Sequence, residues 1–226
     1  MPDIELIVTS DGSHSLRNTR LNETYHSVHG AIQESEHVFI ANGLAFLASA
    51  NHSKDIRILE VGFGTGLNAL LTARYALGTN RQIHYTAFET DPVPSSVVQQ
   101  LNYPKVINVE GCETLFQKLH TTKWSSEERV SDHLILNKQL TRLQDALLGR
   151  EVFDLVFFDA FAPVKQPDLW EISVLSKVEK AMKHGAVLVT YCARGQLKRD
   201  LKSLALRVET LPGPPGKKEM VRALKS

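Results

Sequence analysis

The chain has 226 residues, of which 26 are basic and 25 acidic, so its formal net charge is only +1, and 42% of its residues are hydrophobic. This length supports one sizeable α/β domain, and the composition is that of an ordinary soluble globular protein. No apolar run approaches the ~20 residues of a membrane span, and the N-terminus lacks the segments of a secretory signal. A membrane or exported protein is therefore not expected, and we expect a cytoplasmic location.

The cysteines and histidines do not form a metal site in the sequence. Cys112 and Cys192 lie far apart in a chain without an export signal, so we expect free buried thiols in a reducing compartment. The nine histidines are scattered, and no Cys/His cluster has the spacing of a zinc site. We therefore predict no metal.

Charge is unevenly distributed along the chain. Residues 177–226 contain 12 basic and 4 acidic residues, and the remainder is net acidic. A basic C-terminal segment can face nucleic-acid phosphates. An equally good interpretation is a solvated helix face with Lys and Arg on its outside.

The first 50 residues predict a small N-terminal cap or lid segment. Residues 4–10 alternate weakly as a strand does and end in a turn signal, and a polar connector follows at 14–29. Apolar spacing predicts a helix from 30 to about 50, interrupted near Asn42-Gly43.

From residue 51 onward, strands and helices alternate, which predicts a mostly parallel sheet with helices on both faces. Residues 206–211 and 219–224 read as a terminal antiparallel hairpin. The polar segment at 120–143 reads as an inserted β-hairpin near 130–143 that turns at Asn137-Lys138. The other expected strands are 56–61, 83–88, 105–109, 153–158 and 186–192, and the expected helices are 66–77, one beginning near Pro92, 111–119, 168–183 and one ending near 205.

This arrangement resembles the class I methyltransferase fold, a Rossmann-like α/β fold, with the main domain at 51–226. The turn after the first main strand, Glu60-Val-Gly-Phe-Gly-Thr-Gly-Leu-Asn68, supports the resemblance. Glycines at 62, 64 and 66 let the backbone approach a ligand. A dinucleotide fingerprint would require glycine at position 67. S-adenosylmethionine (SAM), which is cationic near this end, therefore fits better than NAD, and the alternative is an ordinary tight turn.

Further acidic residues lie where ligands of open α/β sheets bind, at the carboxyl ends of the strands. Glu89 closes the second strand and is suited to accept hydrogen bonds from both ribose hydroxyls, although Asp91 competes for that role. Helix capping is the structural alternative for Glu89. Asp145 is a candidate acceptor for the adenine amino group, with an N-cap as its alternative.

The segment Asp159-Ala-Phe-Ala-Pro-Val-Lys-Gln-Pro-Asp-Leu-Trp170 places a carboxylate at the end of the most apolar strand. Pro163 and Pro167 stiffen the loop that follows. A carboxylate facing a methyl donor suits an amine nucleophile, because an amine with a pKa of ~10 must lose a proton, at a cost of about 4 kcal/mol at pH 7. Asp159 is the candidate acceptor of that proton, and the alternative is a helix-capping Asp.

Together, the segments 60–68 and 159–170 resemble the tRNA methyltransferase domain of the MnmC family. Segments 11–44 and 213–220 are similar to that family's N-terminal and C-terminal signatures, so the resemblance covers nearly the whole chain. The chain stops where the family's FAD-dependent oxidase domain would begin, and it therefore resembles the stand-alone form.

The resemblance implies SAM-dependent methylation of the exocyclic amine of 5-aminomethyl-(2-thio)uridine at the tRNA wobble position. It implies tRNA, through its anticodon loop, as the partner, and a separate FAD-dependent oxidase acting upstream. Asp159 would be catalytic. The cofactor residues would be Glu60, Gly62, Phe63, Gly64, Gly66, Asn68, Glu89 and Asp145, and the substrate or RNA residues would be Tyr25, Glu34, His37, Phe161, Lys165, Lys217 and Lys218.

Aromatic and basic side chains are the expected contacts with RNA. Tyr25, Phe161 and Trp170 are candidates to stack on a flipped base, although Trp170 reads better as a core residue. The basic residues expected at phosphates are Lys198, Arg199, Lys202, Lys217 and Lys218.

Two other functions are compatible with the sequence. A polyamine-synthase-like aminopropyl or small-amine transferase also places an Asp beside an amine, but it carries a larger β-rich N-terminal domain. A non-catalytic RNA-binding protein on a methyltransferase fold is the third hypothesis. SAM binding separates it from the two enzymes, and methyl transfer to aminomethyluridine RNA separates the enzymes from each other.

Overall fold

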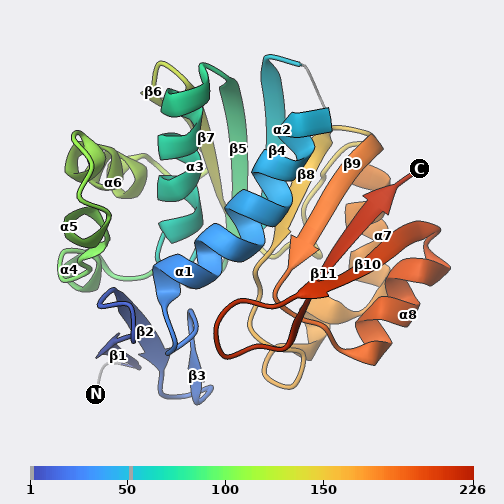
Figure 1. The fold of residues 1–226 in the computed structure, drawn as a ribbon, viewed down its shortest axis with the longest axis horizontal. Coiled ribbons are helices and arrows are strands. Elements are labelled where there is room, and N and C mark those ends of the chain that lie inside the picture. Colours follow the sequence, from blue (N-terminus) through green and yellow to red (C-terminus); the bar gives the residue numbers. More distant parts are fainter. Residues whose placement is uncertain (1–2, 51–52) are drawn as a thin grey trace.

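The computed structural model describes residues 3–50 and 53–226 and shows two β-sheets (Figure 1). The expected domain boundary after residue 50 falls beside Asn51 and His52, which lie outside the described residues. The large sheet has eight strands in the order β10-β11-β9-β8-β4-β5-β7-β6, and the small one has the order β1-β2-β3. The division at this boundary stays a prediction.

The centre of the large sheet is parallel, as the alternation of strands and helices predicts. Strands β7, β5, β4, β8 and β9 run parallel, and β6 and β11 are antiparallel to their neighbours. All residues of β8 are buried, which is typical of a central strand covered on both faces. The strands are β4 Asp55–Val61, β5 Gln82–Glu89, β6 Ser126–Ser131, β7 Leu134–Leu140, β8 Phe153–Phe158, β9 Met182–Thr190, β10 Leu206–Pro212 and β11 Glu219–Lys225.

Two apolar clusters cover the two faces of the sheet. Leu155 and Phe157 of β8 join one cluster, and Val156 and Phe158 join the other, because side chains alternate along a strand. The first cluster includes α3 Leu67–Thr79 and α6 Cys112–Thr121, and the second includes α7 Ile172–Ala181 and α8 Gly195–Ser203. The expected layers of helices on both faces are confirmed. Shorter helices are α4 Ser95–Val98, α5 Tyr103–Ile107 and the 3-10 turn η2 Pro167–Trp170.

The N-terminal part differs from the expected connector. Strands β1 Ile4–Val8, β2 His14–Asn18 and β3 Glu23–Thr24 form a small antiparallel sheet. The polar connector expected at 14–29 therefore contains the two short strands β2 and β3. The strand expected within residues 4–10 is confirmed as β1.

The helix expected at 30–50 is continuous rather than interrupted at Gly43. It runs through α1 Ala31–Ser35, the π-helical η1 Glu36–Ala45 and α2 Phe46–Ala50. A Cβ at Gly43 would lie 2.9 Å from the Val189 side chain and 3.2 Å from the Phe157 ring. The glycine therefore allows the helix to pack closely on β8 and β9, and it does not break it.

Residues 105–109, expected as a strand, contribute instead to helix α5. Pro104 lies in its first turn, and Asn108 ends it in a left-handed conformation with φ 50°. Proline at the start and asparagine at the end are helix boundary signals, and they outweigh the β-branched residues between them.

The hairpin near 130–143 is present, but its turn and its place differ from the expectation. It turns at Asp132-His133, and β7 joins the large sheet parallel to β5. Lys138 is therefore in the middle of β7, where its ammonium donates to the carbonyls of Leu119 at 2.8 Å and His120 at 3.2 Å. A lysine that satisfies the last carbonyls of α6 explains a polar residue in a buried strand.

The terminal antiparallel hairpin of β10 and β11 is confirmed. Across residues 3–50 and 53–226, no helix combines the length and the apolar character that crossing a membrane requires. The same residues contain no group of three or more His, Cys, Asp or Glu side chains arranged to hold a metal ion.

Candidate functional site

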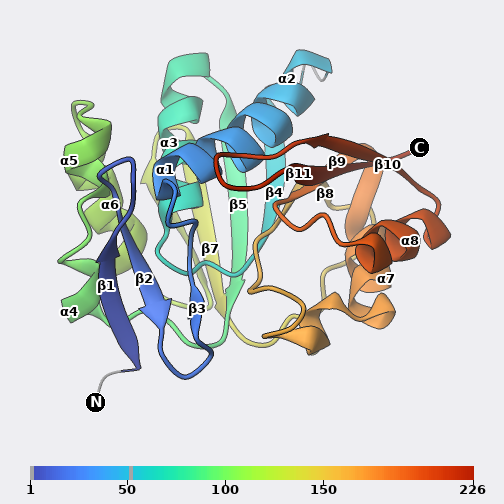
Figure 2. The same ribbon diagram turned by 60° about the horizontal axis from the view of Figure 1, so that its bottom comes forward.

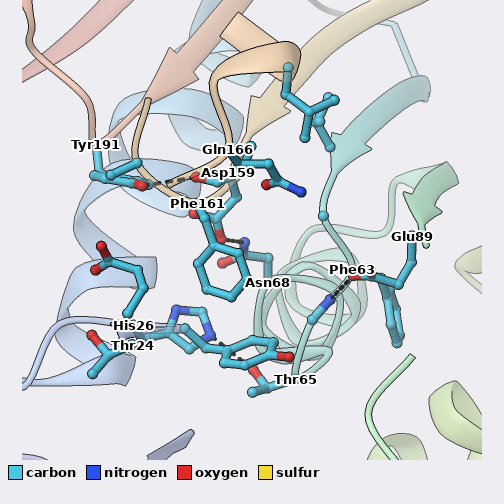
Figure 3. Close-up of a pocket in the computed structure, with 18 of the residues that line it drawn as sticks. Thr24, His26, Phe63, Thr65, Asn68, Glu89, Asp159, Phe161, Gln166 and Tyr191 are labelled. Atoms are coloured by element: carbon cyan, nitrogen blue, oxygen red, sulfur yellow. Dashed lines mark hydrogen bonds between the residues drawn. The ribbon is translucent and has the colours of Figure 1, made fainter. Parts of the chain in front are cut away.

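A cavity of about 660 Å³ opens where β4, β5 and β8 end. Its volume lies within the ~300–1,000 Å³ typical of small-molecule sites. The loops after β4 and β8 form two of its walls (Figure 3). Residues 23–29 and the loop between β10 and β11, called the C-terminal loop here, also line it. Since ligands of open α/β sheets bind at this edge, the cavity is the candidate site.

In the loop after β4, two glycines allow the backbone to lie close to Asp159 and Tyr25. Gly62 has φ +91°, and a Cβ there would lie 2.9 Å from the carbonyl oxygen of Asp159. Gly64 has φ +50°, and its Cβ would lie 3.1 Å from the ring of Tyr25. Glycine is needed at these positions for both conformation and space.

Glu89, the last residue of β5, lines the cavity with a carboxylate that the backbone holds in place. Its Oε2 accepts from the Gly64 N–H at 3.0 Å, and its Oε1 accepts from the N–H groups of Thr90 at 2.7 Å and Asp91 at 3.0 Å. Burial raises the pKa of this carboxyl, and the three N–H donors oppose the rise. Asp91 does not line the cavity, so Glu89 is the better placed of the two acids to accept from ribose hydroxyls.

Asp159 lies directly after β8 and faces the same cavity. Its backbone N–H donates to the carbonyl of Val61 at 3.1 Å, which ties it to the end of β4. Its Oδ2 accepts from the Asn68 side-chain amide at 2.8 Å (Figure 3). Burial and the nearby Glu34 carboxylate raise the pKa of Asp159 well above its ordinary value, and Asn68 and Lys217 oppose the rise.

Glu60 lies behind this pair rather than in the cavity. Its side chain is buried, with 1% exposure, and Oε1 accepts from the same Asn68 nitrogen at 3.0 Å. Burial raises the pKa of Glu60 well above its ordinary range, and the nearby Asp159 raises it further. One amide nitrogen thus joins a buried carboxyl to the carboxyl that faces the cavity.

A second charged group lies near Asp159. Glu34 in α1 is 3% exposed; its Oε1 accepts from the Ser27 N–H at 2.9 Å, and its Oε2 forms an ion pair with Lys217. The Lys217 ammonium lies 4.0 Å from the centre of the Tyr191 ring. The Tyr191 hydroxyl donates to the carbonyl of Ala160 at 2.8 Å, next to Asp159.

Aromatic side chains form part of the cavity wall. The rings of Tyr25 and Phe161 meet edge to face, with centroids 5.0 Å apart. Trp170 is instead buried against Phe158 and donates its indole N–H to the carbonyl of Phe161 at 2.8 Å. The interpretation of Trp170 as a core residue is confirmed, and it supports the loop that carries Phe161.

The lining fits SAM. A fixed carboxylate at Glu89 suits ribose hydroxyls, and the turn at Gly62 and Gly64 leaves room for a ligand beside the backbone. Beside them, the carboxylates of Asp159 and Glu34 suit the cationic group of a second ligand. A family model described as S-adenosyl-L-methionine-dependent methyltransferase matches residues 113–226, half of the chain.

The chain belongs to this family of S-adenosyl-L-methionine-dependent methyltransferases.

Similar proteins agree with the assignment of this methyltransferase. The chain is 29% identical over 239 residues to the tRNA 5-methylaminomethyl-2-thiouridine biosynthesis bifunctional protein MnmC of Burkholderia multivorans, covering 98% of the chain and 35% of that protein. It is 27% identical over 217 residues to the protein of the same name from Idiomarina loihiensis, covering 90% of the chain and 36% of that protein. The chain thus spans about a third of these relatives.

A crystal structure of MnmC2 from Aquifex aeolicus has the same fold. It superposes with a TM-score of 0.77 and 25% sequence identity, covering 97% of this chain and 70% of that one. The expected class I methyltransferase fold and the SAM cofactor are therefore confirmed.

Most of the expected site residues of this methyltransferase meet at the cavity. Tyr25 and Glu34 come from the N-terminal part, and Lys217 comes from the C-terminal loop, so the cavity joins segments distant in sequence. The expected residues that line it are Tyr25, Glu34, Gly62, Phe63, Gly64, Asn68, Glu89, Asp159, Phe161 and Lys217.

Six expected residues do not line the cavity. Glu60 acts behind Asn68, and the N–H of Gly66 donates to the carbonyl of Phe63 within the turn at 2.9 Å. His37 bonds instead to the carbonyl of Pro212 at 2.8 Å. The others are Asp145, Lys165 and Lys218.

Asp145 is exposed, whereas its neighbour Gln144 lines the cavity. Asp145 lies in a turn in which its N–H donates to the Arg142 carbonyl at 3.0 Å. Its side chain does not line the cavity, and the adenine contact stays a prediction.

His26 and Tyr191 are among the lining residues that the sequence-based prediction does not include. His26 is buried and bonds through Nε2 to the Thr65 hydroxyl at 2.9 Å, and burial lowers its pKa to about 4, so the ring is neutral (Figure 3). The sequence feature that could have indicated His26 is that it directly follows Tyr25, an expected substrate residue. Tyr191 directly follows β9, and the rule that ligands bind beyond strand ends would have included it.

Proposed function

We propose that this methyltransferase methylates the primary amine of 5-aminomethyl-(2-thio)uridine at the wobble position of tRNA, to give the 5-methylaminomethyl nucleoside. Support comes from relatives whose names specify tRNA 5-methylaminomethyl-2-thiouridine biosynthesis. The observation that carries the proposal is the acidic end of the cavity, where Asp159 and Glu34 face a site suited to an amine.

Asp159 would accept the proton that the substrate ammonium must lose. An alkyl amine with a pKa of ~10 is almost fully protonated at pH 7, and losing the proton to water costs about 4 kcal/mol. Burial raises the pKa of Asp159, which narrows the gap between donor and acceptor and makes the transfer less unfavourable. The amine lone pair then becomes the nucleophile, and the proton stays on the Asp159 carboxyl.

The residues of the glycine turn and the end of β5 would hold the cofactor. When bound, SAM supplies an activated methyl group on a sulfonium, and this group is transferred to a neutral nucleophile. Glu89 would accept from the ribose hydroxyls, and the backbone at Gly62 and Gly64 would leave space for the amino-acid end. The protein's contribution is alignment, since an in-line displacement depends on the relative position of donor and acceptor.

The base and the RNA backbone would bind outside the acidic end. Tyr25 and Phe161 line the cavity and would contact the flipped base by stacking. The exposed ammonium of Lys218 and the basic face of α8 would contact phosphates. In α8, Lys198 already pairs with Glu219 at 2.8 Å, so we expect a smaller share of the RNA contact from it.

The upstream chemistry requires a different enzyme activity. The named relatives are bifunctional proteins, and we propose that an FAD-dependent oxidase supplies the aminomethyl group on tRNA. Action on maturing tRNA would place this methyltransferase in the cytoplasm.

The two alternatives have less support. A polyamine-synthase-like transferase gains no support from the relatives, whose names specify tRNA 5-methylaminomethyl-2-thiouridine biosynthesis. A non-catalytic RNA-binding protein has no need of a buried, charge-tuned Asp159 beside the glycine turn.

The proposal is tested by incubating the protein with SAM and tRNA from a strain blocked at the aminomethyl stage, followed by mass spectrometry of the nucleosides. We expect a gain of one methyl group on the wobble uridine. Control tRNA that lacks the aminomethyl group should gain nothing. An inert protein, or methylation of the control tRNA at another position, would contradict the proposal.

A further inference from the structure

A lysine ammonium of the protein itself occupies the acidic end of the cavity. Lys217 comes from the loop between β10 and β11, which reaches toward α1 (Figure 2). Its Nζ pairs with Glu34 Oε2 and lies 4.0 Å from the centre of the Tyr191 ring. Its side chain keeps 31% exposure, whereas that of Glu34 has 4%.

These contacts have the chemistry of an alkylammonium site. A buried carboxylate requires a cationic partner, and an aromatic face attracts an ammonium group through its quadrupole. Glu34 is fixed for this task, because its other oxygen accepts from the Ser27 N–H at 2.9 Å. Tyr191 is fixed as well, since its hydroxyl donates to the Ala160 carbonyl at 2.8 Å.

We propose that Glu34 and the Tyr191 ring form an ammonium subsite beside Asp159, that Lys217 occupies it in the substrate-free protein, and that the aminomethyl group of the substrate displaces Lys217. The identity of this ligand rests on the proposed function, but the subsite is defined by the protein's own contacts. Lys217 and the substrate carry the same primary alkylammonium group, so they compete for one carboxylate.

Glu34 and Asp159 have different roles in this arrangement: Glu34 binds the ammonium group, and Asp159 accepts its proton. The substrate enters as RNH3+ and pairs with Glu34. It then gives one proton to the Asp159 carboxylate, leaving RNH2 as the nucleophile and a neutral Asp159 carboxyl. The methylated product is again a cation, RNH2CH3+, which Glu34 can hold until Asp159 loses its proton to solvent.

Another interpretation is that Lys217 only ties the C-terminal loop to the N-terminal part. Other contacts already join these segments: His37 bonds to the Pro212 carbonyl at 2.8 Å, and Gly216 packs so closely on the His29 ring that a Cβ would lie 1.9 Å from it. If Lys217 were only a tie, its removal would loosen the cavity and weaken binding. The two interpretations therefore predict opposite changes in affinity.

The first experiment measures binding of 5-aminomethyluridine by calorimetry in the presence of S-adenosylhomocysteine, so that no turnover occurs. We expect Lys217→Met to tighten binding by about fivefold, the effect of removing one competing ion pair. Glu34→Gln should weaken binding by about tenfold or more. Lys180→Met, which changes an exposed residue of α7 outside the cavity, should leave this affinity unchanged, and uridine, which lacks the amine, should bind all variants equally.

The second experiment uses the wild-type protein, so it does not depend on the folding of a variant. Lysines are acetylated with acetic anhydride, and the extent of labelling is read by peptide mass spectrometry. We expect 5-aminomethyluridine to increase labelling of Lys217 relative to Lys218, because the displaced ammonium becomes free, and we expect uridine to have no effect.

The results also separate the subsite from the proposed function. Unchanged or weaker binding to Lys217→Met, or labelling of Lys217 that the nucleoside leaves unchanged, would overturn the subsite even if tRNA is methylated. Tighter binding and increased labelling in a protein that fails to methylate tRNA would support the subsite and contradict the proposed function.

Discussion

Three ionisable side chains at or behind the cavity wall have pKa values displaced toward their neutral forms. Burial is the largest cause for Glu60, Asp159 and His26, and the pKa of His26 falls to about 4. Such displacement costs stability, because each residue would be better solvated in the unfolded chain. At Asp159 the same displacement is useful, since it brings the carboxyl closer in pKa to the amine whose proton it would accept.

Replacing Glu60 by Gln tests its place behind Asn68. Its pKa in the folded protein lies above the unfolded value of 4.5, so the folded state binds the proton more tightly and stability falls as pH rises from about 4.5 through the folded pKa. Glu60→Gln should therefore be more stable than wild type at pH 8, by ~1 kcal/mol or more, as measured by chemical denaturation. Its SAM affinity by calorimetry should be unchanged, and a large loss would show that Glu60 contacts the cofactor.

The pH dependence of kcat/KM tests the charge on Asp159. Glu34 raises the pKa of Asp159 and Lys217 lowers it, with burial as the largest effect. Because Asp159 must be ionised to accept a proton, we expect activity to fall below its raised pKa. Lys217→Met should move this acidic limb to higher pH, whereas Lys217→Arg, which keeps the charge, should leave it near the wild-type position. A limb that does not move in Lys217→Met would contradict this account.

At the scale of elements, the turn between β4 and α3 depends on missing side chains. Gly62→Ala would place a Cβ 2.9 Å from the Asp159 carbonyl oxygen at φ +91°, which should cost ~1–3 kcal/mol and weaken SAM binding. Gly78→Ala is the matched control: it lies in α3 with nothing within 4 Å of the added Cβ, and it should stabilise the protein by ~0.5–1 kcal/mol. Equal melting temperatures for the two variants would show that the turn is not constrained.

Elements with strong local signals were predictable from the sequence. The apolar run of β8 favoured a buried central strand, and the glycine turn after β4 indicated the sheet edge at which the site lies. Errors arose where tertiary contacts or boundary residues decided the outcome. Lys138 looks like a turn residue, but it is buried in β7 because the carbonyls of Leu119 and His120 accept from its ammonium. Residues 105–109 were predicted as a strand, but Pro104 lies in the first turn of a helix and Asn108 ends it, so most of the segment belongs to α5.

At the scale of the whole molecule, segments from the N-terminal part and from the loop between β10 and β11 meet at the cavity beyond the carboxyl ends of the parallel strands. The ion pair between Lys217 and Glu34 joins residues 183 positions apart, and the contact between His26 and Thr65 joins the N-terminal part to the glycine turn. The sequence indicated Glu34 through family resemblance and Lys217 also through the basic C-terminal segment, but neither signal could show that the two side chains form a pair. The cavity is thus a property of the folded chain.

The central claim is that a carboxylate at the end of β8 serves the methyl transfer from inside the SAM cavity. The most direct measurement compares wild type with Asp159→Asn, which preserves the shape of the side chain and its bond from Asn68, in both SAM binding by calorimetry and methyl transfer to aminomethyluridine tRNA. We predict that the variant binds SAM as wild type does and that its transfer rate falls by ~10²–10⁴-fold. Full activity in Asp159→Asn would contradict the account.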